Sequence, residues 1–261
     1  MSVLPSNLRA VFFDLDDTLC GYWDASKLGM HRAFEVHGPP GFTPKEMVSN
    51  WAASFRDFSK GLKQTGWYET YLKNGEPTRT EQMRLTLERV GIDDPALART
   101  IGDAYAHERD AHLKLFPDAL DVLNALHPTH IMGLITNGPA DIQRQEIETL
   151  GLEPYFPFIY IEGEMGFGKP RPEVFERALA DTGTSPNEVV MVGNSYAHDI
   201  LPAITAGWSS VWIRRDSDVP PSSEGATVKP ESKPEHAPEP TATVGSLTEF
   251  LNLILSSVVR R

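Results

Sequence analysis

The sequence predicts an α/β fold in which a parallel β-sheet, with helices on both faces, is interrupted near its start by an insert made only of helices. Two patterns support this. From residue 117 onwards, short β-rich runs alternate with helical stretches of about ten residues, which is typical of βαβ units around a parallel sheet. Between about residues 22 and 115, apolar residues recur with helical spacing and strand-like runs are almost absent.

The elements of the sheet domain follow in a regular order. The opening run RAVFF is mostly apolar and predicts the first strand. Further strands are predicted at residues 131–138, 158–162, 188–194 and 209–215. Helices are predicted between them at residues 117–126, 140–151, 171–183 and 197–207. The sheet domain therefore comprises residues 1–20 and 113–261, and the helical domain comprises residues 21–112.

The C-terminal part adds a loop and two further elements. Residues 216–240 are rich in Pro, Ser and Glu, and such a composition cannot bury much surface, so a solvated, flexible loop is expected there. The segment 241–258 predicts a short edge strand and a helix that Ser246 caps.

Composition restricts the class of protein. The chain has 261 residues, 40% of them hydrophobic, and a net charge of -12, which argues against non-specific binding of nucleic acid. No stretch approaches the twenty apolar residues that a membrane span needs. The single cysteine, Cys20, fits a reducing compartment. We therefore expect a soluble, cytoplasmic protein that binds neither nucleic acid nor membranes, as a monomer or homodimer.

Three carboxylates follow the first strand. Asp14 and Asp16 are two residues apart, so in an extended chain both point to one face. Such a pair persists only if a proton, a cation or hydrogen bonds relieve the repulsion. An Asp-rich turn with a helix cap is the simpler interpretation of this stretch alone. A calcium loop is not supported, because its D-x-D-x-D-G-x5-E pattern is absent.

Other strand ends carry polar residues too. The second strand ends in Thr136 and Asn137, the segment after the third contains Lys169, and the fourth ends in Asn194, with Asp199 just inside the next helix. In open parallel sheets, ligands bind beyond the carboxyl ends of the strands. Carboxylates, a hydroxyl, an ammonium group and further oxygen ligands at these ends predict a site for a phosphoryl group and a divalent cation.

The order of these motifs resembles the haloacid dehalogenase-like (HAD) hydrolase superfamily. The motifs are DxDxT, a strand ending in Thr-Asn, Lys-Pro before a helix, and GNSxxxDI, and the similarity spans about residues 9–215. The resemblance implies a Rossmann-like core and a Mg²⁺-dependent hydrolase, usually a phosphatase. It also implies that the helical insert is a mobile cap of the helical (C1) type.

Within this resemblance each residue has an expected role. Asp14 would attack phosphorus and form an aspartyl-phosphate. Asp16 would protonate the leaving alkoxide and then deprotonate the hydrolytic water. Mg²⁺ would bind oxygen atoms of the first and last motifs, which are Asp14, Asp16, Asn194 and Asp199. The phosphoryl oxygens would contact Thr18, Thr136, Asn137 and Lys169.

Two residues bear on which reaction is catalysed. Asp16 favours phosphate-ester hydrolysis, since family members that resemble dehalogenases or phosphonate hydrolases lack an acid there; a phosphomutase remains possible. Asn194 stands where the family commonly has Asp, so the metal ligand is neutral and weaker. Alternatively Asn194 only caps the next helix, and the chain is a catalytically weakened binding protein.

Two further functions are disfavoured. A phosphate-binding P-loop in GEMGFGKP fails at Pro170, which replaces the required Ser or Thr and lacks an N–H group. A phosphorylated receiver module is about half this length and has its acceptor Asp on a later strand.

The expected substrate is a small phosphorylated metabolite. In capped members the insert supplies the groups that set specificity. The candidates in this insert are Arg56, Lys60, Lys63, Trp67 and Tyr71.

Overall fold

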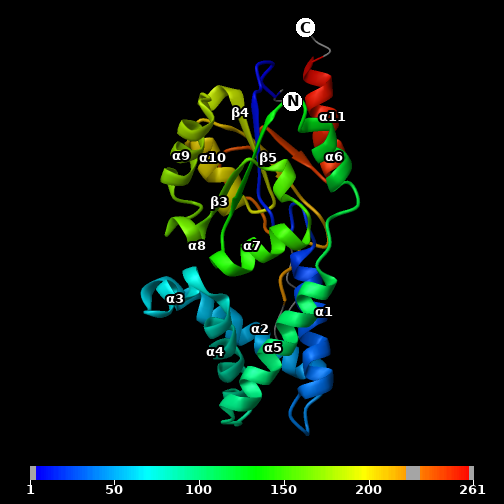
Figure 1. The fold of residues 1–261 in the computed structure, drawn as a ribbon, viewed down its shortest axis with the longest axis vertical. Coiled ribbons are helices and arrows are strands. Elements are labelled where there is room, and N and C mark those ends of the chain that lie inside the picture. The colour runs from blue at the N-terminus through cyan, green and yellow to red at the C-terminus, as the bar shows by residue number, and fades with distance from the viewer. Residues whose placement is uncertain (1–3, 222–229, 259–261) are drawn as a thin grey trace.

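The computed structural model describes residues 4–221 and 230–258, which form a sheet domain and a helical body beside it (Figure 1). Six strands form one sheet in the order β3-β2-β1-β4-β5-β6, and every neighbouring pair is parallel. The strands are β1 (Ala10–Phe13), β2 (Ile131–Thr136), β3 (Phe158–Ile161), β4 (Val189–Gly193), β5 (Ser209–Ile213) and β6 (Ala242–Val244). The predicted parallel α/β fold, with a short strand at its edge, is confirmed.

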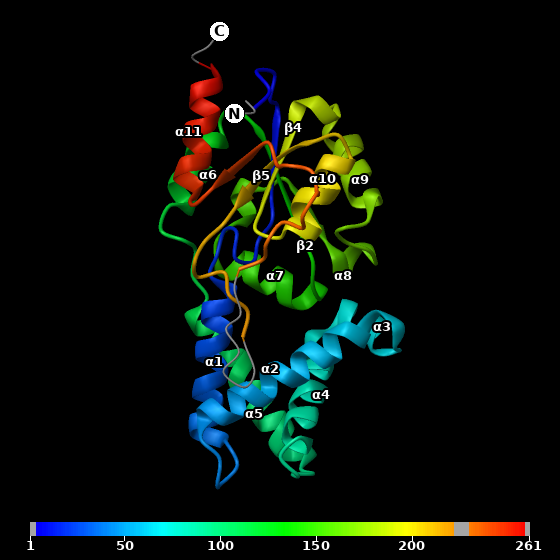
Figure 2. The same ribbon diagram turned by 180° about the vertical axis from the view of Figure 1, so that it is seen from behind.

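Helices cover both faces of the sheet. They are α6 (Ala119–Leu126), α7 (Ala140–Thr149), α8 (Glu162–Met165), α9 (Pro172–Thr182), α10 (Leu201–Thr205) and α11 (Leu247–Val258). Helices α6, α7 and α11 share one hydrophobic cluster with the sheet, and α9 and α10 share the other. Figure 2 shows α6 and α11 on one side of the strands and α9 and α10 on the other. As expected, the Ser246 hydroxyl caps α11 by accepting from the N–H of Glu249 at 3.1 Å.

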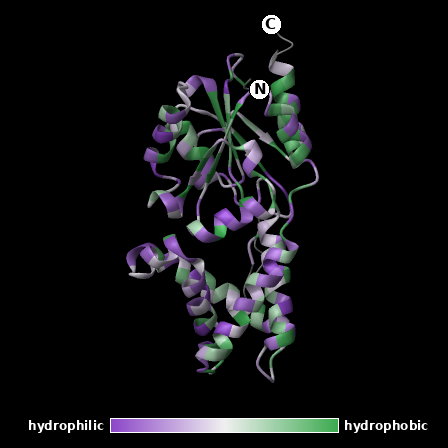
Figure 3. Ribbon diagram, in the orientation of Figure 1, coloured by the Kyte–Doolittle hydropathy of each residue, from purple (hydrophilic) through white to green (hydrophobic). Residues whose placement is uncertain are grey.

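Strand β1 lies at the centre of the core and is buried on both faces. Val11 and Phe13 belong to one cluster and Phe12 to the other, as the alternation of a strand requires. Figure 3 shows the strands as mainly hydrophobic. Gly133 on β2 makes room for the Phe12 ring, because a Cβ at residue 133 would lie 2.3 Å from that ring. The polar residues after β1 therefore follow a rigid, fully buried segment.

The insert forms its own helical body. It contains α1 (Tyr22–His37), α2 (Pro44–Gly61), the 3₁₀ turn η1 (Leu62–Gln64), α3 (Trp67–Lys73), α4 (Gly75–Glu88) and α5 (Pro95–His112). Buried residues of α1, α2, α4 and α5 form a separate cluster that includes Met30, Trp51, Met83 and Ile101. Helices α1 and α5 approach closely at Gly29, where a Cβ would lie 2.7 Å from the backbone nitrogen of Arg109. None of the helices in the described ranges is long and apolar enough to cross a membrane.

The chain after β4 departs from the predicted helix 197–207. Residues Tyr196–Ile200 form a π-helical turn, η4, and the α-helix starts only at Leu201. The hydroxyl of Ser195 caps this turn by accepting from the N–H of His198 at 3.3 Å. The wider turn directs Asp199 back toward the strand ends, where it contacts Lys169.

The loop predicted at residues 216–240 also differs in part from expectation. Residues 216–221 and 230–240 contain no helix or strand, as predicted, and residues 222–229 lie outside the described part. However, the loop is not simply solvated. The buried Asp218 accepts from the Asn194 side chain, and Glu231 accepts from the backbone N–H groups of Tyr196 and Ala197. The described parts therefore pack against the strand ends.

Candidate active site

The predicted residues gather at one edge of the sheet, where β1, β2 and β4 end. A cavity of about 370 Å³ lies there between the sheet and the insert. Seven of the eight predicted site residues line it: Asp14, Asp16, Thr136, Asn137, Lys169, Asn194 and Asp199. The eighth, Thr18, lies behind Asp14, and its hydroxyl donates to Asp14 Oδ2 at 3.0 Å. The topology brings these residues together because parallel strands end at the same edge.

Lys169 is the central cation of this cavity. Its side chain is 2% exposed, and its Nζ donates to Asp14 Oδ1 and to Asp199 Oδ1, each at 2.6 Å. Burial opposes the charge, but the two carboxylates outweigh burial and raise the pKa of Lys169. The ammonium group is therefore charged at neutral pH and points at the carboxylate expected to attack phosphorus.

The side chain of Asn137 holds Lys169 in place. Its Nδ2 donates to the Lys169 carbonyl at 2.7 Å, and its Oδ1 accepts from the Lys169 N–H at 2.9 Å. Both ends of the amide are occupied, so this side chain positions the lysine. A contact between Asn137 and a phosphoryl group would therefore use its backbone N–H or the second N–H of Nδ2.

The two leading carboxylates have different environments. Burial raises the pKa of Asp14 to about 6, although the charge of Lys169 opposes the shift. Burial and the charge of Asp14 raise the pKa of Asp16 to about 7. Both pKa values are raised, and Lys169 contacts Asp14 directly, so Lys169 favours the anion on Asp14 and leaves the proton to Asp16.

Gln143 connects two predicted residues and was missed from the sequence. Its Oε1 accepts from the Thr136 hydroxyl at 2.5 Å, and its Nε2 donates to Asp16 Oδ2 at 3.2 Å and to Glu146 Oε2 at 2.9 Å. The residue lies in the first turn of α7, directly after the strand that ends in Thr136. A glutamine there has no distinctive sequence pattern, so only the packing of α7 reveals its contact with Asp16.

Asn194 and Asp199 differ in how they use their oxygens. Asn194 Oδ1 lies 3.3 Å from the Thr18 hydroxyl, which also donates to Asp14, and the Asn194 amide donates to Asp218 at 3.0 Å. Both oxygens of Asp199 are engaged, one by Lys169 and the other by the N–H of Ser195 at 2.9 Å. Asn194 does not provide the cap of the turn that follows, since Ser195 does. This arrangement favours Asn194 over Asp199 as a direct metal ligand.

The donor set suits a hard cation. No three His, Cys, Asp or Glu side chains within the described residues converge as a ready-made metal site. A carboxylate of Asp14, the backbone carbonyl of Asp16 and the amide oxygen of Asn194 are all oxygen donors at adjacent strand ends. Mg²⁺ is commonly bound by one or two carboxylates with water completing its shell. The buried carboxylates here also have raised pKa values, because burial and mutual repulsion disfavour their charge. A divalent cation would relieve that repulsion.

Asp17 also lines this cavity and adds a third carboxyl group beside Asp14 and Asp16. Its side chain is buried, burial and the charge of Asp16 raise its pKa to about 9, and its backbone has a positive φ of 59°. Its Oδ1 accepts from the N–H of Trp23 at 3.1 Å, which ties the start of α1 to the site. Asn can adopt this backbone conformation and keep that hydrogen bond.

Asp17→Asn is therefore expected to raise the free energy of unfolding by about 1–3 kcal/mol at neutral pH in EDTA. Because folding raises the pKa of Asp17 from 3.8 to about 9, this group does not destabilise the wild type below pH 3.8. The wild type loses folding stability as the pH rises from 3.8 toward 9. The gain in melting temperature should consequently grow with pH. Thermal unfolding at several pH values measures this, with the exposed Asp93→Asn as the control. A gain that is independent of pH would contradict the explanation.

The insert supplies part of the cavity wall. Of the five predicted specificity residues, Lys63 and Tyr71 line this cavity, while Arg56, Lys60 and Trp67 are not among its lining residues. Lys63 Nζ lies 3.3 Å from Glu162 Oε1. The Tyr68 hydroxyl donates to the same oxygen at 2.7 Å. Glu162, 4% exposed at the end of β3, thus joins the insert to the sheet.

A family comparison agrees with this geometry. Residues 11–213 match the model of the family described as haloacid dehalogenase-like hydrolases. The chain belongs to this family. The matched residues of this haloacid dehalogenase-like hydrolase span strands β1 to β5 and the whole insert. The match therefore includes every strand-end residue described above.

Individual relatives of this hydrolase are phosphatases by name. It is 36% identical over 140 residues to phosphoserine phosphatase of Thermus thermophilus, an alignment that covers 53% of this chain and 55% of the relative. It is 29% identical over 218 residues to N-acylneuraminate-9-phosphatase of Rattus norvegicus, covering 82% and 86%.

Among solved structures, the HAD hydrolase YfnB from Bacillus subtilis, bound to magnesium, is similar in fold. The TM-score is 0.70 at 20% identity, with 95% of this chain and 98% of the other covered.

Proposed function

We propose that this hydrolase is a Mg²⁺-dependent phosphatase that cleaves the monoester of a small phosphorylated metabolite through an aspartyl-phosphate on Asp14. The observation that carries the proposal is the pair of carboxyl groups at the end of β1. Asp14 contacts a buried cation, and the neighbouring Asp16 has a pKa near neutrality. The names of the relatives, which act on phosphate esters, support the same reaction class.

The first half-reaction follows from these positions. An oxygen of Asp14 attacks phosphorus while the bond from phosphorus to the ester oxygen breaks. Asp16 gives its proton to the departing alkoxide, so that the alcohol leaves uncharged. The Nζ of Lys169 lies 2.6 Å from Asp14, so it is next to the phosphoryl group when that group transfers to Asp14. There its positive charge neutralises negative charge on the phosphoryl oxygens.

The second half-reaction returns the enzyme to its starting state. Asp16, now ionised, takes a proton from a water molecule as that water attacks phosphorus. The bond between phosphorus and Asp14 breaks and inorganic phosphate leaves. Gln143 holds the Asp16 carboxyl by donating to it, which keeps the acid oriented in both steps.

Mg²⁺, when bound by Asp14, the Asp16 carbonyl and Asn194, would supply positive charge beside the transferring phosphoryl group. Asp199 has a different role in this proposal. Its carboxylate contacts Lys169 and the N–H of Ser195, so it positions the lysine rather than the metal.

The test is the release of inorganic phosphate from a panel of esters, with Mg²⁺ and with EDTA. We expect release with Mg²⁺ and little with EDTA. Product analysis separates hydrolysis from mutase activity, since a phosphomutase returns an isomeric phosphate ester. Absence of phosphate release from every ester, p-nitrophenyl phosphate included, would leave the binding-protein alternative.

Asn194→Asp is expected to lower the Mg²⁺ concentration for half-maximal activity by roughly tenfold, since a charged ligand replaces a neutral one. Asp218 opposes this gain, because its carboxylate lies 3.0 Å from the Asn194 amide and would repel a second carboxylate. The double variant Asn194→Asp/Asp218→Asn should therefore gain more than the single variant. Titration calorimetry and activity against Mg²⁺ measure both. Unchanged affinity in both proteins would remove Asn194 from the coordination shell.

A further inference from the structure

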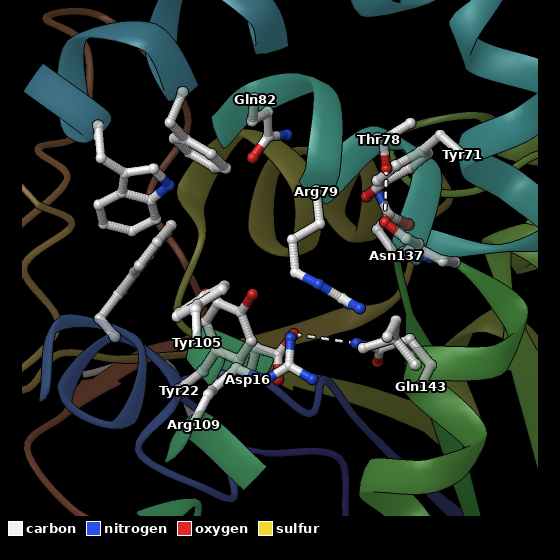
Figure 4. A pocket seen from close by; sticks show the side chains of 17 residues that line it. Asp16, Tyr22, Tyr71, Thr78, Arg79, Gln82, Tyr105, Arg109, Asn137 and Gln143 are labelled. Atoms are coloured by element: carbon white, nitrogen blue, oxygen red, sulfur yellow. Dashed lines mark hydrogen bonds between the residues drawn. The ribbon is translucent and has the colours of Figure 1, made fainter. Parts of the chain in front are cut away.

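A second cavity adjoins the first on the side of Asp16. Its volume is about 210 Å³, and it lies between the strand ends and helices α2, α4 and α5 of the insert (Figure 4). Asp16, Tyr22, Trp23, Tyr71 and Asn137 line both cavities, whereas Asp14 and Lys169 line only the first. An acid that protonates the leaving oxygen must lie next to the leaving group. The second cavity is therefore placed to hold the part of the substrate that departs as alcohol.

The walls of this cavity combine aromatic rings with two guanidinium groups. Trp51 and Phe55 of the insert provide apolar surface, and Arg79 and Arg109 provide positive charge. The only carboxylate among its described lining residues is Asp16. A ligand with apolar carbon and a negative charge matches these walls.

Arg109 is already neutralised within the protein. Its Nε and one terminal nitrogen donate to Asp110 Oδ1 at 2.9 and 2.6 Å, and Glu146 lies 4.0 Å away. Its guanidinium also lies over the rings of Tyr22 and Tyr105. These contacts hold Arg109 as part of the wall and already give its charge a carboxylate partner.

Arg79 differs from Arg109 in its contacts. Its Nε is buried and has no hydrogen-bond partner among the described residues. Its nearest carboxylate is that of the exposed Asp103, at 3.9 Å, which is beyond hydrogen-bond distance. Figure 4 shows the side chain extending from α4 into the cavity toward Asp16 and Gln143. A guanidinium group with open donors, 14% exposed, is stabilised when a two-oxygen anion binds it.

Lys63 is a weaker candidate for the same task. It lines the first cavity only, is 55% exposed and is paired with Glu162. A planar guanidinium also matches the two oxygens of a carboxylate or phosphate better than an ammonium group does. The geometry thus selects Arg79 from the cations of the insert that line the two cavities.

We propose that Arg79 binds a second anionic group, a carboxylate or a second phosphate, on the leaving group of the substrate. This inference rests on the proposed phosphatase function and narrows its substrate class. The substrate is a small phosphate monoester whose alcohol part carries another negative charge and enough carbon to contact Trp51 and Phe55. Arg79 then determines specificity, while Asp14 and Asp16 perform the chemistry.

The experiment compares pairs of esters that differ in the second charge. The pairs are phosphoglycolate and 2-hydroxyethyl phosphate, 3-phosphoglycerate and glycerol 3-phosphate, and fructose 1,6-bisphosphate and fructose 6-phosphate. We expect the wild type to prefer the charged member of at least one pair by roughly 10- to 100-fold in kcat/KM, the effect of one charged hydrogen-bonded contact. A preference in either of the first two pairs indicates that Arg79 binds a carboxylate, and a preference in the third indicates that it binds a second phosphate.

Variants then assign the preference to Arg79. Arg79→Gln should bring the ratio of kcat/KM between the two esters of a pair close to one, mainly through a change in KM. Arg79→Lys should retain part of the preference. Arg84→Gln is the matched control on the same helix, because Arg84 pairs with Glu81 and Glu88 and does not line the cavity. It should leave the ratio unchanged.

A binding measurement removes the dependence on turnover. Calorimetry in the Asp14→Asn background gives the Kd of the esters with and without the second anionic group. The same measurement is made after adding Arg79→Gln. The ester with the second anionic group should lose roughly 10- to 100-fold in affinity, and the ester without it much less. Equal losses for both members, or a wild type without preference in any pair, would overturn the inference while hydrolysis still supports the phosphatase. Hydrolysis of no ester would instead contradict the proposed function.

Discussion

Replacement of Asp14 by asparagine should abolish turnover, leaving less than about one thousandth of the wild-type kcat. The amide has nearly the same shape but does not attack phosphorus. The fold should be retained, because Lys169 keeps Asp199 as a partner and because burial already disfavours the charge of Asp14. Phosphate release and the melting temperature, measured on the same preparation, check both statements.

Trapping of the intermediate makes this prediction specific. Rapid acid quench of the wild type during turnover should give an intact mass increased by one phosphoryl group, and the Asp14→Asn variant should give none. Intact mass before the reaction also serves as the control that the asparagine has not deamidated. Near wild-type activity in a variant of verified mass would show that Asp14 is not the nucleophile.

Asp16→Asn should lower kcat by roughly 10² or more with an alkyl phosphate, since the alkoxide then leaves without a proton. The loss should be much smaller with p-nitrophenyl phosphate, whose leaving group needs no proton. The pKa of about 7 adds a second expectation. Wild-type kcat with alkyl esters should fall as the pH rises above about 7, because Asp16 then lacks the proton it must donate.

Comparison of the two substrates distinguishes catalysis from structure. A variant that is merely distorted would lose activity equally with both esters, and that outcome would remove Asp16 from the role of acid. The matched control is Gln143→Leu, which leaves the carboxyl in place but removes the N–H group that orients it. It should reduce kcat with alkyl esters less than Asp16→Asn does.

The sequence was sufficient to predict which residues at the strand ends lie together. Asp14, Thr136 and Asn194 lie at the ends of three separate strands, and parallel pairing brings those strand ends together regardless of how the helices pack. Local order along the chain therefore determines this part of the site. The same reasoning correctly predicted the edge strand and the Ser246 cap, which depend on short segments.

Residues contributed by packing were not predictable in this way. The contacts of Gln143 and Arg79 depend on how α7 and α4 lie against the strand ends, which no spacing in the sequence reveals. The charged and aromatic residues of the insert gave five candidates, and only Lys63 and Tyr71 line a cavity. The π-helical turn was also missed, because Tyr196–Ile200 has ordinary helical composition.

The strength of the contact between the insert and the sheet at Glu162 depends on the ionic strength of the solution. The buried carboxylate of Glu162 accepts from Tyr68 and pairs with Lys63, whose side chain is more than half exposed. Dissolved ions weaken a pair with such an exposed member, while the hydrogen bond from the phenol is little affected. Separation of the two bodies would hydrate the carboxylate, which offsets part of the lost attraction. The cavity at the strand ends is thus bordered by a contact that becomes weaker as salt is added.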